Sequence, residues 1–128
     1  MKPEQAVKNS IMNYLRGQAN VKCWVNNTQG SPVKGGGFHK SPNSIRGVSD
    51  ILGYQSIGET LPDAIFIGIE TKSPQGLKKW HKEKDTYNTT AWWQNMFLTE
   101  LSRDGGIAII TDSLDDFILQ WDGAIRIR

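Results

Sequence analysis

Residues 64–72, Ala-Ile-Phe-Ile-Gly-Ile-Glu-Thr-Lys, give the strongest strand signal in the chain. Alternate residues of a strand point to opposite sides. One side carries Ile65, Ile67, Ile69 and Thr71, and the other carries Ala64, Phe66, Gly68, Glu70 and Lys72. The fold must therefore accommodate a strand that is apolar on one side and that carries a carboxylate and an ammonium group together on the other.

The rest of the chain predicts a mixed α/β fold, in which a central, largely antiparallel sheet is flanked by helices. Apolar spacing and capping residues predict helices over 3–18, from 89 or 90 to 103, and, as a short last helix, after the capping box at 113–116. Further strands are predicted over 21–27, 48–54 and 107–111, with an edge strand at Ile125 and Ile127. The segments 29–47 and 73–90 are polar and basic, and we expect them to connect these elements.

The composition excludes several classes of protein. The 128 residues suffice for one domain, which we assign to 1–128. A mean hydropathy of -0.47 and the lack of any apolar run of about 20 residues exclude a membrane-spanning protein. The N-terminus lacks the apolar stretch of a secretory signal, so we expect a cytoplasmic protein. The single cysteine, Cys23, and the two histidines argue against a disulfide and a Cys/His zinc site.

Positive charge is concentrated in the first part of the chain, although the net charge is only +2. Residues 1–48 contain seven basic side chains and one acid, whereas residues 91–122 contain six acids and one base. Lys34, Lys40 and Arg46 lie along the Gly-rich segment 29–47. Spaced positive charge suits a phosphate backbone, which makes these three residues candidates for contact with nucleic acid, and the motifs must decide. A merely solvated surface is the alternative.

Three polar residues at the ends of two predicted strands suggest a chemical site. Asp50 begins one strand, and Glu70 and Lys72 end the next, so antiparallel pairing would bring them together. Two carboxylates and a backbone carbonyl, which we assign to Thr71, suit Mg2+ or another hard divalent cation. A neighbouring lysine can hold an attacking water or stabilise charge on a phosphate. The alternative is a surface ion pair between Glu70 and Lys72.

An ordered set of motifs extends this arrangement along most of the chain. The set consists of Gly47-Val48-Ser49-Asp50-Ile51-Leu52-Gly53, Phe66-Ile67-Gly68-Ile69-Glu70-Thr71-Lys72-Ser73-Pro74, Gln94 followed by Phe97 and Leu98, and Gly105 before an apolar strand and Ser113. In this order the motifs resemble the VRR-NUC (virus-type replication-repair nuclease) branch of the PD-(D/E)XK nucleases. The resemblance runs from Glu4 to about Asp116.

The resemblance implies a restriction-endonuclease-like core and a DNA endonuclease that depends on Mg2+ or Mn2+. It implies that Asp50 and Glu70 ligate the metal, that Lys72 assists the nucleophile, and that Gln94 orients groups at the site. Glu4 would match the acidic residue of the family's first helix and join the metal ligands; the alternative is a first-turn glutamate favoured by the helix dipole. The resemblance further implies a homodimer, a preference for branched, flapped or junction DNA, and a phage or mobile-element origin in a bacterial host cell.

Two features depart from the family pattern. Ser49 replaces the proline that usually precedes the aspartate, which leaves the metal-binding oxygens unchanged. The segment 73–94 is longer and more basic than the usual link, and its Lys78 and Lys79 are further candidates for contact with DNA. Aromatic residues of this segment either stack on unpaired bases or belong to the core; they are Trp80, Tyr87, Trp92 and Trp93.

Two other functions are compatible with the same sequence. A nucleic-acid-binding module without catalysis would keep the basic segment 29–47 and use the acids only structurally. A phage assembly or interaction protein would place some of the five tryptophans on a partner surface. Direct cleavage of DNA by the purified protein separates these functions from a nuclease.

Overall fold

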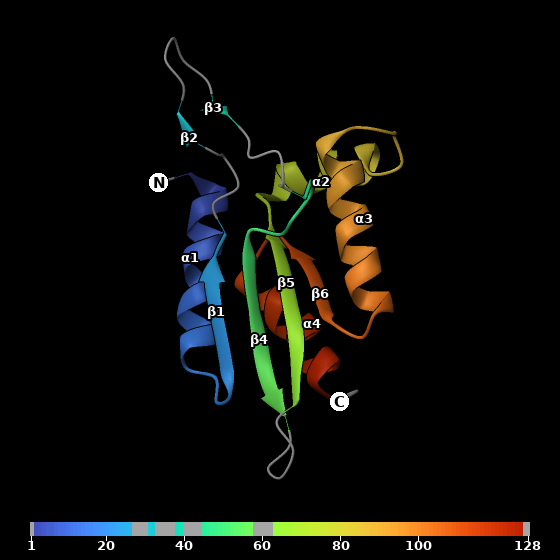
Figure 1. Cartoon of the computed structure of the whole chain (residues 1–128). Coiled ribbons are helices and arrows are strands. Elements are labelled where there is room, and N and C mark those ends of the chain that lie inside the picture. Colours follow the sequence, from blue (N-terminus) through green and yellow to red (C-terminus); the bar gives the residue numbers. More distant parts are fainter. Residues whose placement is uncertain (1, 27–30, 33–37, 40–44, 58–62, 127–128) are drawn as a thin grey trace.

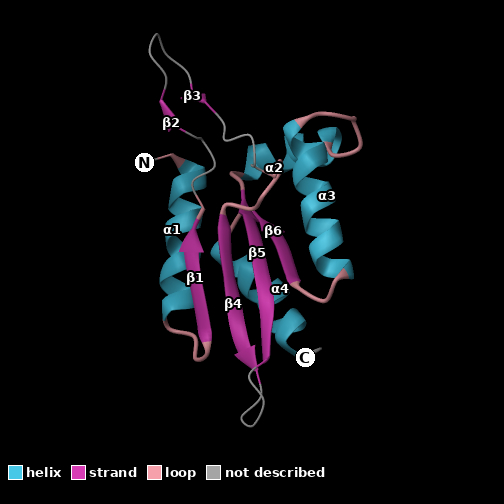
Figure 2. Ribbon diagram, viewed as in Figure 1, coloured by secondary structure: helices cyan, strands magenta, loops and turns pink. Residues whose placement is uncertain are grey.

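The computed structural model describes residues 2–26, 31–32, 38–39, 45–57 and 63–126. Figure 1 shows how the elements are arranged, and Figure 2 distinguishes helices from strands. The elements are α1 (Pro3–Arg16), β1 (Val21–Val25), β2 (Ser31–Pro32), β3 (Phe38–His39), β4 (Ile51–Ile57), β5 (Asp63–Thr71), α2 (Pro74–Glu83), α3 (Thr90–Arg103), β6 (Ile107–Thr111) and α4 (Leu114–Arg126).

Four of the strands form one mixed sheet in the order β1-β4-β5-β6. β4 is antiparallel to both β1 and β5, whereas β6 is parallel to β5. The predicted mixed α/β fold with a largely antiparallel sheet is thereby confirmed. The register pairs Ile51 of β4 with Ile69 of β5, so Asp50 and Glu70 are the next two residues to face each other. β2 and β3 form a separate antiparallel pair.

Helices cover the two faces of the sheet unequally. α1 and α4 pack on the face that carries Ile67 and Ile69, and the main core lies there. α3 packs on the opposite face, against β5 and β6, where Trp80 of α2, Ala91 and Leu98 form a smaller core. In Figure 1 no described helix crosses in front of β1 and β4, so that half of the face has no helical layer.

Local sequence signals fix the ends of α3 and α4. The Thr89 hydroxyl accepts a hydrogen bond from Trp92 N at 3.1 Å, and the Ser113 hydroxyl accepts one from Asp116 N at 3.1 Å. Both bonds satisfy amide groups that the first turn of a helix leaves unpaired. α3 ends before Gly105, whose φ of 93° lies in the left-handed region. The helix predicted from 89 or 90 to 103 and the capping box are confirmed.

The segment 73–90 contains a helix, α2, that its polar composition did not predict. Ser73 is the N-cap, and its hydroxyl accepts a hydrogen bond from Gly76 N at 3.0 Å. Pro74 occupies the first helical position, where its missing N–H is not needed. The helix is anchored by Trp80, which is only 5% exposed.

The edge strand predicted at Ile125 and Ile127 is wrong for Ile125, which belongs to α4. Phe117 and Trp121 are fully buried, and Ile125 follows at the same spacing of four residues. The helical period of these large side chains outweighs the short alternation of isoleucine with arginine. Ile127 lies outside the described residues.

Other boundaries differ by a few residues from the predicted ones. The strand predicted over 48–54 covers Ile51–Ile57, and the first helix ends at Arg16. Within 29–47, the described part includes the short β2–β3 pair. Among the described helices, none combines the length and the apolar character that crossing a membrane requires.

Candidate active site

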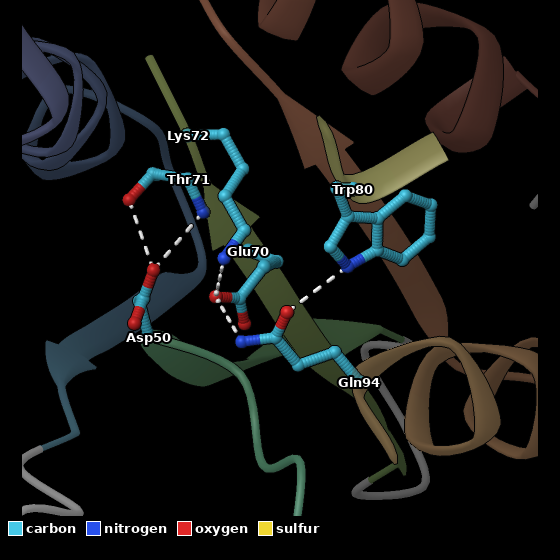
Figure 3. A network of polar contacts seen from close by, with 6 residues as sticks. All are labelled: Asp50, Glu70, Thr71, Lys72, Trp80 and Gln94. Atoms are coloured by element: carbon cyan, nitrogen blue, oxygen red, sulfur yellow. Dashed lines mark hydrogen bonds and ion pairs between the residues drawn. The ribbon is translucent and has the colours of Figure 1, made fainter. Parts of the chain in front are cut away.

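Glu70 is a buried carboxylate at the end of β5. Only 2% of the residue is exposed. Its Oε1 accepts a hydrogen bond from Gln94 Nε2 at 2.9 Å and lies 3.6 Å from the Lys72 ammonium nitrogen (Figure 3). Its Oε2 is buried and has no hydrogen-bond partner among the described residues. Buried polar atoms are normally hydrogen-bonded, so Oε2 is an acceptor suited to a ligand.

Asp50 lies beside this carboxylate at the start of β4 (Figure 3). Its Oδ2 accepts hydrogen bonds from Thr71 N at 3.1 Å and from Thr71 Oγ1 at 3.0 Å. Its backbone oxygen accepts a hydrogen bond from Asn26 N at 2.7 Å, which joins it to the chain just beyond β1. The predicted convergence of Asp50, Glu70 and Lys72 at one end of the sheet is confirmed.

Gly47 fixes the turn that leads into Asp50. Its φ is +78°, and a Cβ at this position would lie 2.2 Å from Trp93 O and 2.7 Å from Gln94 N. Only glycine allows the two backbones to approach so closely in this conformation. The close approach holds the turn against α3, next to the helical residue that contacts Glu70.

The surroundings of Glu70 raise the pKa of its carboxyl well above the ordinary value of 4.5. Burial is the largest cause, because it disfavours the charged form, and the negative charge of Asp50 is the second. The Lys72 ammonium acts in the opposite direction and lowers the pKa. Smaller increases come from the protonated form of Glu70, which can donate a hydrogen bond to Asp50 that the ionised form cannot make, and from the charge of Glu4. The site therefore has too little positive charge to favour an ionised Glu70.

Gln94 connects Glu70 to a tryptophan that the sequence did not place in the site. Trp80 Nε1 donates a hydrogen bond to Gln94 Oε1 at 2.9 Å, so a buried chain of side chains runs from α2 through α3 to β5 (Figure 3). The interpretation that Trp80 stacks on bases is wrong, because the side chain is in the core. The helix-start signal at Ser73 and Pro74 could have indicated this, since it predicts a helix whose large apolar residues face inward.

Thr71 and Glu4 occupy different positions relative to the pair of acids. Thr71 is fully buried. Glu4 lies in the first turn of α1 and is half-buried, near enough for its charge to raise the pKa of Glu70. Within the part of the chain that the structure describes, no three His, Cys, Asp or Glu side chains form a group that could hold a metal ion. Glu4 is therefore not gathered with Asp50 and Glu70 into a preformed cluster.

The predicted DNA-contacting residues are only partly described. Arg46 donates a hydrogen bond to Asn88 Oδ1 at 3.2 Å, and its guanidinium lies 5.3 Å from the centre of the Trp93 ring. It is thus held against the start of α3 while remaining exposed. Lys34 and Lys40 lie outside the described residues.

The lysines of α2 face the solvent. Lys78 and Lys79 are both exposed, and Lys79 Nζ lies 3.9 Å from Glu83 Oε1. The remaining aromatic residues of this region form edge contacts, with ring centres 4.9 Å apart for Tyr87–Trp92 and also for Trp92–Trp93.

The chemistry of the two acids fits a hard divalent cation. Asp50 and Glu70 offer carboxylate oxygens, the ligands that Mg2+ and Mn2+ prefer, and Glu70 Oε2 is buried without a described partner. A cation would balance the negative charge that burial disfavours. Cys23 offers no competing chemistry, because burial raises the pKa of its thiol to about 11 and keeps it protonated at neutral pH.

No family model, curated protein or solved structure matches this chain. The function is therefore inferred from the geometry of the Asp50–Glu70–Lys72 site and from the order of the sequence motifs.

Proposed function

We propose that this chain is a metal-dependent DNA endonuclease of the VRR-NUC branch, with a restriction-endonuclease-like core. The observation that carries the proposal is the buried Glu70 facing Asp50, with Glu70 Oε2 unpaired among the described residues. The Lys72 ammonium, 3.6 Å from Glu70 Oε1, adds the positive charge that phosphate chemistry uses. The motif order around these residues supports the family.

In the proposed reaction a water molecule attacks a DNA phosphate and the bond between phosphorus and one ester oxygen breaks, so that phosphorus gains the OH of the water and the leaving oxygen takes up its proton. Asp50, Glu70 and the backbone carbonyl of Thr71 would hold Mg2+ or Mn2+, whose charge would stabilise the negative charge that builds up on the phosphate. Lys72 orients the water or stabilises the same charge. Gln94 donates a hydrogen bond to Glu70 Oε1 at 2.9 Å, so Oε2 would be the oxygen of Glu70 available to the cation.

The burial of Glu70 argues against a purely structural role for the acids. An exposed ion pair between Glu70 and Lys72 would contribute little to stability, but Glu70 is 2% exposed and its pKa is raised. A buried acid whose surroundings disfavour its charge is characteristic of functional sites. This observation favours catalysis over a non-catalytic nucleic-acid-binding module.

Further parts of the proposal concern the DNA and the assembly. Lys78 and Lys79, exposed on α2, and Arg46 would contact the phosphate backbone without reading sequence, together with Lys34 and Lys40. A homodimer and a preference for branched, flapped or junction DNA follow from the family resemblance.

Cleavage of DNA tests the proposal directly. Purified protein is incubated with linear, flapped and four-way DNA, in Mn2+ and in EDTA. We expect cleavage only in Mn2+, and a loss of at least about 100-fold in Asp50→Asn, Glu70→Gln and Lys72→Met, since each removes a group placed at the reacting phosphate. Asp85→Asn is the matched control, because Asp85 is 82% exposed. Unchanged cleavage by Asp50→Asn or Glu70→Gln, or equal cleavage in EDTA, would reject the assignment.

A further inference from the structure

Three aromatic side chains from three adjacent strands lie exposed on one face of the sheet. Trp24 of β1 is 44% exposed, Tyr54 of β4 is 37% exposed, and Phe66 of β5 is 44% exposed. We refer to these three residues as the aromatic face. A single exposed aromatic residue is common, but aromatic residues on neighbouring strands of one sheet face are typical of an interaction surface.

The strand register places the aromatic face on the same side of the sheet as the two acids. Tyr54 pairs directly with Phe66 on one side and with Lys22 on the other. Directly opposed residues of antiparallel strands share a face, and so do residues two positions apart in one strand. Phe66 therefore shares its side of β5 with Glu70, four residues further along. Trp24 shares its side of β1 with Lys22.

The open part of the sheet is continuous with the site. α3 covers β5 and β6 of this face, whereas no described helix crosses in front of β1 and β4 in Figure 1. Leu52 lies between Asp50 and Tyr54 on the same side of β4, and it is half-buried. A linear ligand on the aromatic face would thus end at the carboxylates.

The chemistry of the aromatic face favours bases over a protein segment. Each of its three members has a planar ring, and aromatic rings stack on any nucleobase. The exposed Lys22 lies beside Tyr54 and supplies a charge for the phosphate backbone. Such positive charge is complementary to a polyanion.

We propose that the aromatic face is a stacking platform for the unpaired bases of single-stranded DNA whose backbone continues to Asp50 and Glu70. The placement of the cleaved phosphate rests on the proposed nuclease function, whereas the stacking itself does not. A platform of this kind gives a physical reason for preferring flapped or branched DNA, since only unpaired bases can lie flat on the rings.

Binding of short labelled oligonucleotides tests the platform without any cleavage. The protein carries Glu70→Gln, the buffer contains EDTA, and fluorescence anisotropy follows a 12-nucleotide oligo(dT), an abasic strand of equal length, and a 12-base-pair duplex. We expect oligo(dT) to bind more tightly than the abasic strand. Trp24→Leu, Tyr54→Leu and Phe66→Leu should each weaken oligo(dT) binding by about 5- to 140-fold, the range for loss of one stacked base.

The leucine substitutions keep the face apolar and remove only the rings, and thermal unfolding verifies that each variant is folded. Leu119→Ala is the matched control, because Leu119 is 75% exposed on α4, on the other side of the sheet. The salt dependence of the remaining binding should not change, since the phosphate contacts are kept. Binding of the duplex and of the abasic strand should also stay the same.

Three results would overturn the platform. One is equal affinity for oligo(dT) and the abasic strand, and another is full oligo(dT) affinity in the leucine variants. The third is a dimer of the DNA-free protein that becomes monomeric in the triple leucine variant, which would assign the face to a second copy of the chain. If oligo(dT) bound more tightly than the abasic strand but the wild type cleaved no DNA in Mn2+, the proposed nuclease function would be rejected and the stacking platform would still hold.

Discussion

Trp80 fixes the orientation of the Gln94 side-chain amide. The indole nitrogen can only donate, so the atom that faces it at 2.9 Å must be the amide oxygen of Gln94. The amide nitrogen is then directed to Glu70 Oε1, also at 2.9 Å. Trp80, acting through Gln94, thus decides that Glu70 receives a hydrogen-bond donor instead of a second acceptor.

Replacing this tryptophan should impair the site without removing any of its acids. In Trp80→Phe the amide oxygen of Gln94 loses its donor and the amide is free to turn over. We expect cleavage to fall by about 10- to 100-fold, as for other residues that orient metal ligands. The free energy of unfolding should fall by about 1–3 kcal/mol, because a buried acceptor is left unpaired. Cleavage rates and denaturant unfolding measure the two effects.

Trp93→Phe is the matched control for this change. Trp93 Nε1 also donates a hydrogen bond, to Asn88 Oδ1 at 3.0 Å, but this bond is exposed. The control should therefore cut DNA at a rate close to that of the wild type. Equal loss of cleavage in the two variants would mean that the Trp80–Gln94 bond has no particular role in orienting Glu70.

Gly47→Ala should displace the turn that leads into Asp50. A Cβ here would lie 2.2 Å from Trp93 O, and the φ of +78° adds about 1–2 kcal/mol of strain for a non-glycine residue. We expect the free energy of unfolding to fall by more than this amount, and cleavage to fall further because Asp50 moves. In Gly123→Ala, with nothing within 4 Å of the new Cβ in α4, stability should rise by about 0.5–1 kcal/mol. Thermal unfolding of both variants checks the contrast.

The strand pair that carries the acids could be predicted from the sequence because its signal is local. Alternation places Glu70 and Lys72 on one side of the strand whatever that side packs against. A turn-rich connection to the preceding strand favours antiparallel neighbours, and this brings Asp50 to the same end of the sheet. Helical spacing also aligns Gln94 with Phe97, Leu98 and Leu101 on the inward face of its helix, and the 9% exposure of Gln94 agrees with this.

Contacts between segments that lack a strong local pattern could not be predicted in this way. Trp80 and Gln94 are 14 residues apart, and their hydrogen bond depends on how α2 packs against α3. The polar composition of 73–90 outweighed the capping signal of Ser73, because a single buried tryptophan gives no periodicity. The burial of Glu70 Oε2 without a hydrogen-bond partner among the described residues likewise could not be predicted, since burial is decided by all neighbouring elements together.

The raised pKa of Glu70 makes the stability of the metal-free protein depend on pH. Between the unfolded value of about 4.5 and the higher folded value, the folded chain keeps a proton that the unfolded chain releases. The stabilisation by this proton is fully present below the unfolded value and is lost as the pH rises through the folded value. Denaturant unfolding in EDTA should show this loss in the wild type but not in Glu70→Gln.

The control for charge alone is Glu100→Gln, since Glu100 is an exposed acid on α3. This variant should keep the same pH dependence as the wild type. If the free energy of unfolding changed with pH in the same way in the wild type and in Glu70→Gln, this would contradict the raised pKa of the buried Glu70 carboxyl.

Mn2+ should raise the melting temperature of the wild type. A ligand that binds only the folded state stabilises it by mass action, by about 2.7 kcal/mol at a free concentration 100 times the dissociation constant. Glu70→Gln and Asp50→Asn should lose most of this shift, because each replaces a charged oxygen ligand by a neutral amide. Asp85→Asn, with its 82% exposed side chain, should keep the shift.

Since metal binding displaces the proton that the buried Glu70 carboxyl favours, the wild-type shift in melting temperature should also increase as the pH rises. Scanning calorimetry over a Mn2+ titration at two pH values measures both effects, and an equal response of Glu70→Gln and wild type would place the metal site elsewhere in the chain.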